Sequence, residues 1–217
     1  MSRGRMIFAP GIEGYLESVR QARDPILLEM EQRAEETGFP IVGPDAGRLL
    51  HILARAARAR RVLELGSGYG YSAYWLARAL PEGGEVICTD RDPEHRDAAL
   101  AYFARAGLQG KLRFEVGDAL ELLDQLRGPF DLIFNDIDKR AYPAVIERVV
   151  ARLPVGGLFL TDNTLWKGKV AAPDEADETD DQLAGVLEFN RALAAHPQLD
   201  VVILPLRDGV TVAMRRE

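Results

Sequence analysis

From about residue 62 onward, short apolar runs that fit β-strands alternate with stretches that fit amphipathic helices. The apolar runs occur at residues 62–65, 85–89, 112–116, 131–135 and 158–161. The helical patterns follow at 72–80, at 93–106, from about 119, at 142–153 and, after a long polar loop, at about 182–195. Such alternation is typical of a parallel sheet covered by helices on both faces. It predicts an α/β fold of the doubly wound type.

The end of the chain departs from this alternation. Residues 201–204 and 210–214 are consecutive apolar runs, and the loop between them contains Asp208-Gly209. An Asp-Gly pair between two strands favours a β-hairpin, in which the second strand runs antiparallel to the first. The sequence therefore predicts a seven-stranded, mostly parallel sheet with an antiparallel last strand.

Additional helices are expected before the alternating region. Ile12, Tyr15, Leu16 and Val19 follow helical spacing, a second helix begins at Asp24-Pro25 and ends near Gly38, and a third covers 45–58. A chain of 217 residues fits one domain. We expect residues 1–40 to form a helical segment that covers the site or contacts another subunit, and residues 41–217 to form the core.

Charge and composition argue against a nucleic-acid-binding, a disulfide-bonded and a membrane-spanning protein. The net charge of −7 argues against a broad nucleic-acid surface. Cys88 is the single cysteine, so no internal disulfide forms, and its apolar surroundings indicate a buried strand residue. No apolar run approaches the roughly 18 residues of a membrane span, and the first residues lack the apolar stretch of a secretory signal. These features lead us to expect a cytoplasmic protein without a membrane partner.

Polar residues close two neighbouring strands of the predicted sheet. Asp136 and Lys139 follow the strand at 131–135, and Asp162 and Asn163 follow the strand at 158–161. Because the carboxyl ends of parallel strands meet in one crevice, these side chains are expected to converge. Three oxygen ligands and an amine predict a divalent cation and a proton acceptor. In the alternative interpretation, Asp136 and Asp162 only cap loops and Asn163 makes a turn.

A glycine-rich loop follows the first strand of the core, between Glu64 and Gly70. Its spacing is G-x-G-x-G, whereas the dinucleotide motif needs G-x-G-x-x-G, and Tyr71 stands at the last position of that motif. Asp90 ends the second strand, where a carboxylate can accept both ribose hydroxyls, and Asp118 follows the third. Alone, the glycines could form merely a tight turn, and each aspartate is more often a turn or helix cap. Together with Glu64, they predict a site for an adenosine that carries an amino acid at its other end.

Other polar and aromatic residues allow more than one interpretation. Asp138 could contact the cofactor, assist the metal or face solvent, and Tyr142 and Trp166 could flank an aromatic acceptor or pack in the core. The acidic loop at 174–181 is either a solvated surface segment or a lid over the pocket. Structural roles are expected for the histidines, which lie away from the strand ends: His51, His95 and His196.

These motifs resemble the class I S-adenosylmethionine-dependent O-methyltransferases of the caffeoyl-CoA and catechol type, which have a Rossmann-like fold. The likeness runs from about Ile41 to Arg215, and the Asp-x-Asp-Lys and Asp-Asn segments are its most specific part. One departure is Asn135, since an apolar residue is usual before the first aspartate. The segments that carry the likeness are Glu64 to Ser72, Asp90, 117–119, 130–134, 136–139, 156–157, 162–163, 204–205 and 208–209.

The resemblance implies a set of ligands and roles. S-adenosylmethionine would bind at Glu64, Gly66, Ser72, Asp90, Asp118 and Ala119, with Ile41 and Val42 at its methionine end and Asp136 beside it. A divalent metal, usually magnesium, would be held by Asp136, Asp162 and Asn163. Lys139 falls at the position of the catalytic lysine, as a base or as a cation that stabilises the phenolate. Members of this family are commonly dimers, so a homodimer is expected.

The leading hypothesis is a metal-dependent O-methyltransferase that acts on a small aromatic vicinal diol of the catechol or caffeoyl kind. A version that methylates a hydroxylated uridine in tRNA would use the same metal site and need a basic surface, for which the candidates are Arg3, Arg5, Arg20, Arg23 and Arg33. Two other classes remain as alternatives. One is an NAD-dependent oxidoreductase, and the other is a nucleotide-binding module without catalytic activity.

Overall fold

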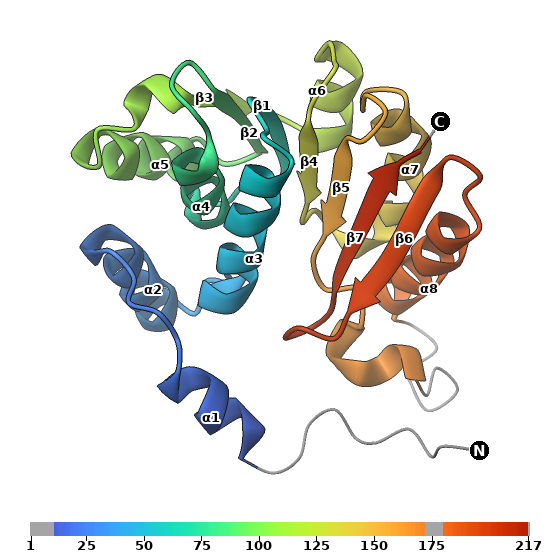
Figure 1. Cartoon of the computed structure of the whole chain (residues 1–217), viewed down its shortest axis with the longest axis horizontal. Helices are drawn as coiled ribbons and strands as arrows, with labels where there is room; N and C mark the ends of the chain where they lie inside the picture. The colour runs from blue at the N-terminus through green and yellow to red at the C-terminus, as the bar shows by residue number, and fades with distance from the viewer. Residues whose placement is uncertain (1–10, 172–179, 217) are drawn as a thin grey trace.

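A computed structural model describes residues 11–171 and 180–216 of the chain, and its centre is one seven-stranded sheet (Figure 1). The strand order is β3-β2-β1-β4-β5-β7-β6. The strands are β1 (Arg61–Leu65), β2 (Glu85–Asp90), β3 (Leu112–Val116), β4 (Leu132–Asn135), β5 (Leu158–Thr161), β6 (Leu199–Leu204) and β7 (Val210–Arg215).

The strand directions confirm the predicted architecture. β1 pairs in parallel with β2 and β4, β2 with β3, and β4 with β5. β7 is antiparallel to both β5 and β6. Consequently the carboxyl ends of the parallel strands and the tip of the β6–β7 hairpin lie at the same edge of the sheet.

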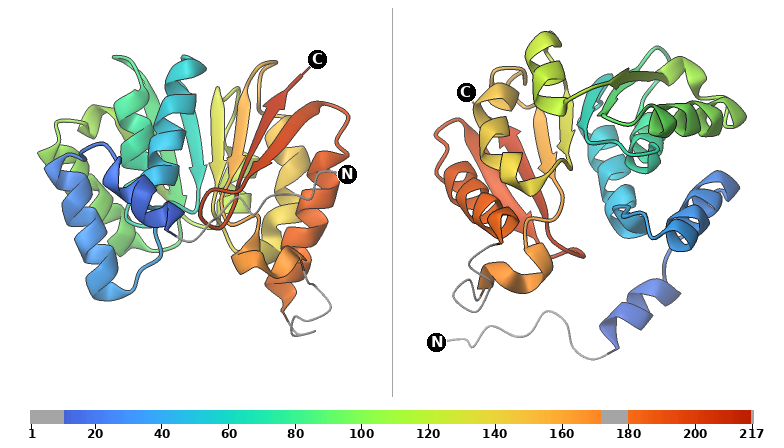
Figure 2. Two further views of the ribbon diagram at one scale, coloured as in Figure 1. Left: turned by 60° about the horizontal axis from the view of Figure 1, so that its bottom comes forward. Right: turned by 180° about the vertical axis from the view of Figure 1, so that it is seen from behind.

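Helices cover both faces of the sheet, and further helices precede the core (Figure 2). α3, α4 and α5 lie on one face and α6, α7 and α8 on the other, while α1 and α2 lie beyond α3 (Figures 1 and 2). Their bounds are α1 (Ile12–Ser18), α2 (Pro25–Thr37), α3 (Gly43–Ala56), α4 (Tyr71–Ala79), α5 (Pro93–Arg105), α6 (Ala119–Gln125), α7 (Tyr142–Val150) and α8 (Asp181–Ala194).

Aspartates begin several of these helices by accepting hydrogen bonds from otherwise unpaired backbone N–H groups. Asp24 caps α2 through Ile26 and Leu27, Asp92 caps α5, and Asp118 caps α6. Asp92 and Asp118 lie just beyond the ends of β2 and β3. Two of the residues that begin helices, Asp92 and Asp118, therefore also lie at the carboxyl edge of the sheet.

The core consists of two apolar clusters, one on each face of the sheet. The first joins α2, α3, α4 and α5 to the sheet, and the second joins α6, α7 and α8 to it. α1 lies outside both clusters, since its Tyr15 and Leu16 are exposed, as is Val19 directly after it. Within 11–171 and 180–216, no helix is long and apolar enough to cross a membrane.

Candidate functional site

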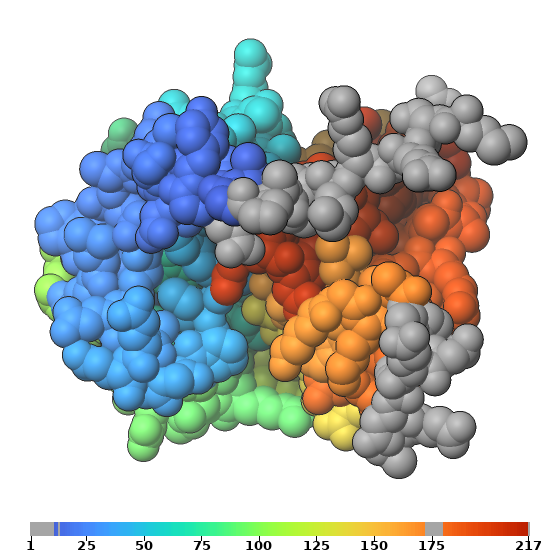
Figure 3. Space-filling view, turned by 90° about the horizontal axis from the view of Figure 1, so that it is seen from below, coloured from blue at the N-terminus to red at the C-terminus, as the bar shows by residue number. Residues whose placement is uncertain are grey.

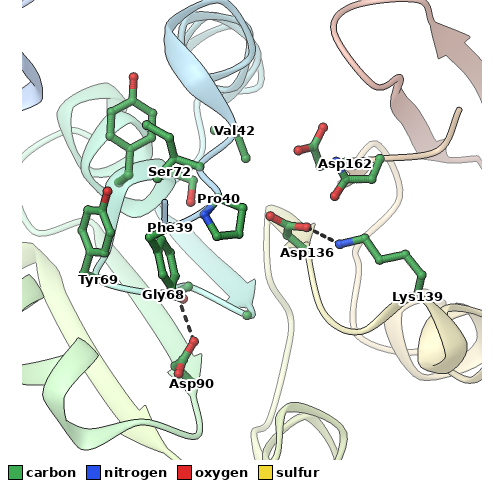
Figure 4. A pocket seen from close by; sticks show the side chains of 15 residues that line it. Phe39, Pro40, Val42, Gly68, Tyr69, Ser72, Asp90, Asp136, Lys139 and Asp162 are labelled. Carbon is green, nitrogen blue, oxygen red and sulfur yellow. Dashed lines mark hydrogen bonds and ion pairs between the residues drawn. The ribbon is translucent and has the colours of Figure 1, made fainter. Parts of the chain in front are cut away.

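A pocket opens at the carboxyl edge of the sheet between the segment before α3 and the loops after β1, β4 and β5. Figure 4 shows Gly68, Ser72 and Asp90 on one side of it and Asp136, Lys139 and Asp162 on the other. Its lining includes most of the residues predicted for the cofactor and all of those predicted for the metal: Ile41, Val42, Gly66, Ser72, Asp90, Asp136, Lys139, Asp162 and Asn163.

The glycine-rich turn is set by a close approach of two backbone segments. Gly66 has a φ of 81°, and a Cβ at this position would lie 2.5 Å from the carbonyl oxygen of Asp136. The Asp136 N–H also donates to Leu65 O at 2.9 Å. Glycine is needed because a side chain would clash with the backbone just after β4 and would disfavour the left-handed conformation. The turn therefore places the loop after β1 directly against the loop that carries Asp136.

Asp90 is held in a fixed orientation by the turn and by α5. Its Oδ2 accepts from Gly68 N at 2.9 Å, and its Oδ1 accepts from Asp92 N at 2.9 Å. His95 Nδ1 lies 3.0 Å from the same Oδ1. The expectation that His95 lies away from the strand ends is wrong, because the first turn of α5 carries its ring back onto the end of β2. The sequence signal for this contact was its place in the first helical turn after Asp90.

Two acidic side chains and one amine meet on the opposite wall. Lys139 Nζ is 2.9 Å from Asp136 Oδ1, and only 4% of Asp162 is exposed. Burial, followed by the negative charge of Asp136, raises the pKa of Asp162. Burial also raises the pKa of Asp136, while the Lys139 ammonium opposes that rise. Two neighbouring carboxylates, of which only Asp136 is paired with an amine, form a site where additional positive charge is favourable.

Asn163 completes this wall in a left-handed conformation, with a φ of 56°. Its amide nitrogen lies 3.4 Å from Asp208 Oδ2 in the β6–β7 loop, so the amide oxygen remains available to a ligand. Nowhere in the described part of the chain do three or more acidic, histidine or cysteine side chains form a metal-binding group. The predicted set has two carboxylates and one amide. All three donors are oxygen atoms, the type that magnesium prefers, so the residues fit this metal.

Glu64 occupies a different position from the other predicted cofactor residues. It is fully buried in β1 beneath the glycine turn and does not line the pocket. Cys88 Sγ donates to its Oε2 at 3.5 Å, and Ser67 and Ser72 also hydrogen-bond to the carboxyl group. Burial raises the pKa of Glu64 to about 7. In this structure Glu64 supports the turn from below.

Asp118 and Ala119 line a second pocket, of about 270 Å³, which shares Gly66, Asp90 and Asp136 with the first. Asp118 Oδ1 caps α6, while Oδ2 pairs with the exposed guanidinium of Arg91. The structure thus divides the predicted cofactor residues between two adjoining pockets. An adenine amino group that donated to Asp118 would share the carboxylate of this residue with the guanidinium of Arg91.

The aromatic residues proposed to flank an acceptor are placed elsewhere. Tyr142 is fully buried and donates to Asp162 O at 2.9 Å, and Trp166 packs against the apolar cluster of α7 and α8. Trp166 Nε1 donates to Asp180 at 3.2 Å. Neither residue lines the pocket. Full burial makes the acceptor-flanking interpretation wrong for Tyr142, whereas for Trp166, which is only partly buried, it stays a prediction. Asp138 is exposed and pairs with Arg140.

A wider groove of about 840 Å³ adjoins the first pocket and shares Ile41, Asp162 and Asn163 with it. α1, α2 and the β6–β7 loop form its outer walls. Figure 3 shows the β6–β7 loop in red between the blue N-terminal helices and the orange segment after β5.

The groove also contains part of the basic surface that tRNA binding would require. Arg20 pairs with Asp45 at 2.7 Å and Arg23 with Glu31 at 2.8 Å, so their charges are compensated. Arg33 lies over the ring of Tyr69. Arg3, Arg5 and most of the acidic loop at 174–181 lie outside the described residues.

The chain is similar in sequence and in structure to known O-methyltransferases. Residues 19–216 match a family model described as O-methyltransferase. A catechol O-methyltransferase from Niastella koreensis is 33% identical, covering 94% of this chain and 96% of its own. Caffeoyl-CoA O-methyltransferase 1 of Eucalyptus globulus is 38% identical over 79% of this chain and 73% of its own. The structure of the O-methyltransferase TomG from Streptomyces achromogenes, solved with SAM, superposes with a TM-score of 0.85 at 30% identity over 95% of this chain and 96% of that one.

Proposed function

The chain belongs to the O-methyltransferase family, and from this premise we propose that it transfers the methyl group of S-adenosylmethionine to one hydroxyl of a small aromatic vicinal diol. The observation that carries this proposal is the arrangement in Figure 4, in which Asp136, Lys139 and Asp162 face Gly68 and Asp90 across one pocket. A methyl donor along the glycine turn would present its sulfonium to the acidic wall. The family match also argues against the oxidoreductase and the non-catalytic module.

The donor side of the site is formed by residues that bind and orient. Asp90, already held by Gly68 N and Asp92 N, would accept the ribose hydroxyls. Ile41 and Val42 would contact the methionine end, and the pocket that contains Asp118 and Ala119 would receive the adenine. SAM in the related TomG structure supports the choice of donor.

The acceptor side must make a hydroxyl anionic and align it. A phenol with a pKa near 10 is mostly neutral at pH 7. Asp136, Asp162 and Asn163 would hold magnesium, whose charge would lower the pKa of a hydroxyl bound beside it. The phenolate oxygen then forms a bond to the methyl carbon while the carbon–sulfur bond breaks and its electron pair remains on sulfur. The products are an aryl methyl ether and S-adenosylhomocysteine, and the phenol proton is released to solvent.

Lys139 contributes a positive charge next to the reacting oxygen. Its ammonium is ion-paired with Asp136 and only 13% of its side chain is exposed. A cation in this position stabilises a phenolate more strongly than it would in water, because burial weakens solvent screening. We therefore propose that Lys139 acts through its charge rather than as the base.

The test is methyl transfer from labelled S-adenosylmethionine to catechol and to caffeic acid, with magnesium and again with excess chelator. We expect transfer that requires the metal, and no transfer to phenol, which has a single hydroxyl. A magnesium-dependent rise in melting temperature that is lost in Asp162→Asn would report metal binding independently of activity. Equal transfer with and without the chelator would contradict metal dependence, and transfer to none of the diols would contradict the proposed acceptor.

We further propose that α1 and α2 cover the acceptor groove and that the protein forms a homodimer. Residues from both helices line the groove, which supports the role as a cover. Tyr15 and Val19 are 61% and 57% exposed, and apolar surface of this kind is typical of subunit contacts. Light scattering on Val19→Glu and on the unmodified protein tests the dimer, since a monomeric unmodified protein would contradict it.

A further inference from the structure

The groove beside the cofactor pocket is where an acceptor must enter. In-line displacement requires the attacking oxygen to approach the methyl carbon from the side opposite to sulfur. With the donor along the glycine turn, that side faces Asp162 and Asn163, which line both the pocket and the groove. Substituents on the acceptor that lie away from the reacting hydroxyl would therefore extend toward the outer walls of the groove.

Arg207 is the arginine of this groove that makes no ion pair with a described carboxylate, although its charge acts at longer range on Asp45, Asp136 and Asp162. The other two arginines in its walls, Arg20 and Arg23, form ion pairs with Asp45 and Glu31. Among the residues that the structure describes, the Arg207 guanidinium makes one hydrogen bond, from Nη1 to Ile41 O at 2.8 Å, and no ion pair. Its remaining N–H groups are available to a ligand, since a guanidinium has five donors.

The backbone of the β6–β7 loop directs this side chain into the groove. Arg207 has a φ of 52°, a left-handed conformation that is unfavourable for a long side chain. The loop is fixed by hydrogen bonds from Thr164 N to Gly209 O and from Leu165 N to Asp208 O, at 3.1 and 2.8 Å. These bonds anchor it to the segment that carries Asn163.

The opposite side of the groove leaves space for the guanidinium. A Cβ at Gly43 would lie 2.7 Å from Arg207 Nη1, so this position must lack a side chain for the guanidinium to rest there. The positive charge also acts on the acidic wall, where it lowers the pKa of both Asp136 and Asp162 against the larger effect of burial. Arg207 is therefore held between the cofactor-binding segment and the mouth of the acceptor groove.

We infer that Arg207 is a specificity-determining residue that binds an anionic group, a carboxylate or a phosphate, on the methyl acceptor. This inference rests on the proposed function, because it concerns the acceptor side of the same site. The planar fork of a guanidinium matches the two oxygens of a carboxylate or phosphate. An acceptor of this class would place its diol at Asp136, Asp162 and Asn163 and its anionic group at Arg207.

The experiment compares two acceptors that differ in charge, catechol and protocatechuate, the latter being a catechol with a carboxylate. The quantity measured is kcat/KM for protocatechuate divided by kcat/KM for catechol. We expect this ratio to fall about tenfold in Arg207→Gln, the size of one lost charge-assisted hydrogen bond. Arg207→Gly should give the same fall without backbone strain, because glycine adopts the left-handed conformation freely.

Arg113→Gln is the matched control, since Arg113 is an exposed arginine on β3, at the other end of the sheet. It should leave the ratio unchanged. A fall of about fivefold or more in both Arg207 variants supports the inference, and a smaller fall in either variant overturns it. If the unmodified enzyme methylates neither acceptor, the proposed function itself fails, which is a separate outcome.

Two further measurements follow from the charge of Arg207. The KM for protocatechuate should rise with ionic strength more steeply than the KM for catechol, because salt screens an exposed ion pair. Inhibition by benzoate and by phenyl phosphate then distinguishes the two anionic groups. If benzoate inhibits the unmodified enzyme more strongly and Arg207→Gln abolishes this inhibition, the anionic group is a carboxylate; the same result with phenyl phosphate indicates a phosphate. If each compound inhibits the enzyme and the variant equally, the inference is contradicted.

Discussion

Replacing Asn135 by leucine should make the protein more stable. Asn135 ends β4 immediately before Asp136, its side chain is fully buried, and neither atom of its amide group hydrogen-bonds to any described residue. A buried polar group without a partner costs about 1–3 kcal/mol. Leucine has the same branching and no polar atom, so Asn135→Leu removes two such costs.

The expected magnitude follows from these two amide groups. Their removal contributes about 2–6 kcal/mol, and the greater bulk of leucine in a packed core costs about 1–3 kcal/mol. The net gain is about 1–3 kcal/mol, which for a chain of this size raises the melting temperature by about 2–12 °C. Calorimetry without ligands and urea unfolding at one pH measure both quantities.

Asn190 provides a matched control for this substitution. Its amide nitrogen donates to Thr164 O at 2.8 Å, while its amide oxygen is buried without a partner in the described structure. Asn190→Leu therefore removes one unpaired atom but leaves Thr164 O without its donor, and should give a lower melting temperature than Asn135→Leu. A melting temperature of Asn135→Leu below that of the unmodified protein would refute the reasoning, because it would mean that the amide group of Asn135 is hydrogen-bonded in the folded protein. If stability rises while methyl transfer falls, the polar side chain serves the neighbouring Asp136 at a cost in stability.

Three further predictions concern other parts of the molecule. Lys139→Ala should lower kcat about 10²–10³-fold, the effect of losing one electrostatic stabiliser, and change the dissociation constant of S-adenosylmethionine much less, and an unchanged kcat would remove Lys139 from the mechanism. Burial raises the pKa of Glu64 to about 7, so the folded protein keeps the proton of this carboxyl group to a higher pH than the unfolded chain does. The contribution of the protonated group to the free energy of unfolding is therefore complete below about pH 4 and is lost as pH rises through about 7. Glu64→Gln should therefore flatten the fall in melting temperature over this interval, and an unchanged slope would disprove the assignment. A Cβ at Gly47 would lie 2.3 Å from the Trp75 ring, so Gly47→Ala should destabilise by about 1–3 kcal/mol in urea unfolding, whereas Gly110→Ala, which meets open space, should not.

Periodic patterns were sufficient to predict the sheet and the meeting point of its loops. The strands differ from their predicted ranges by at most two residues at either end, and the reversal of the last strand followed from Asp208-Gly209. Asp136 and Asp162 converge because parallel strands that pair in register end at the same edge. These features depend on the order and direction of the strands, which the spacing of apolar residues predicts.

The directions of side chains in loops and at helix starts could not be predicted from the sequence in the same way. Tyr142 stands at the first residue of α7, where the spacing does not show that its ring turns into the core. Arg207 was missed because its orientation depends on a positive φ in a five-residue loop, and an arginine carries no signal for that conformation. Asn135 could be recognised as unusual in sequence, but only the structure shows that its amide group is buried without a protein partner.

The antiparallel position of β7 has a consequence for how this enzyme can be altered. Because β7 reverses, the sheet reaches the acceptor side through a hairpin tip, residues 205–209, instead of through a crossover helix. Asp208 and Gly209 of this tip bond to the segment that carries Asn163, so an exchange that leaves these two residues in place keeps both strands paired at small entropic cost. The residues proposed to hold the methyl donor lie on other loops. New acceptors can therefore be explored by exchanging residues 205–207 alone.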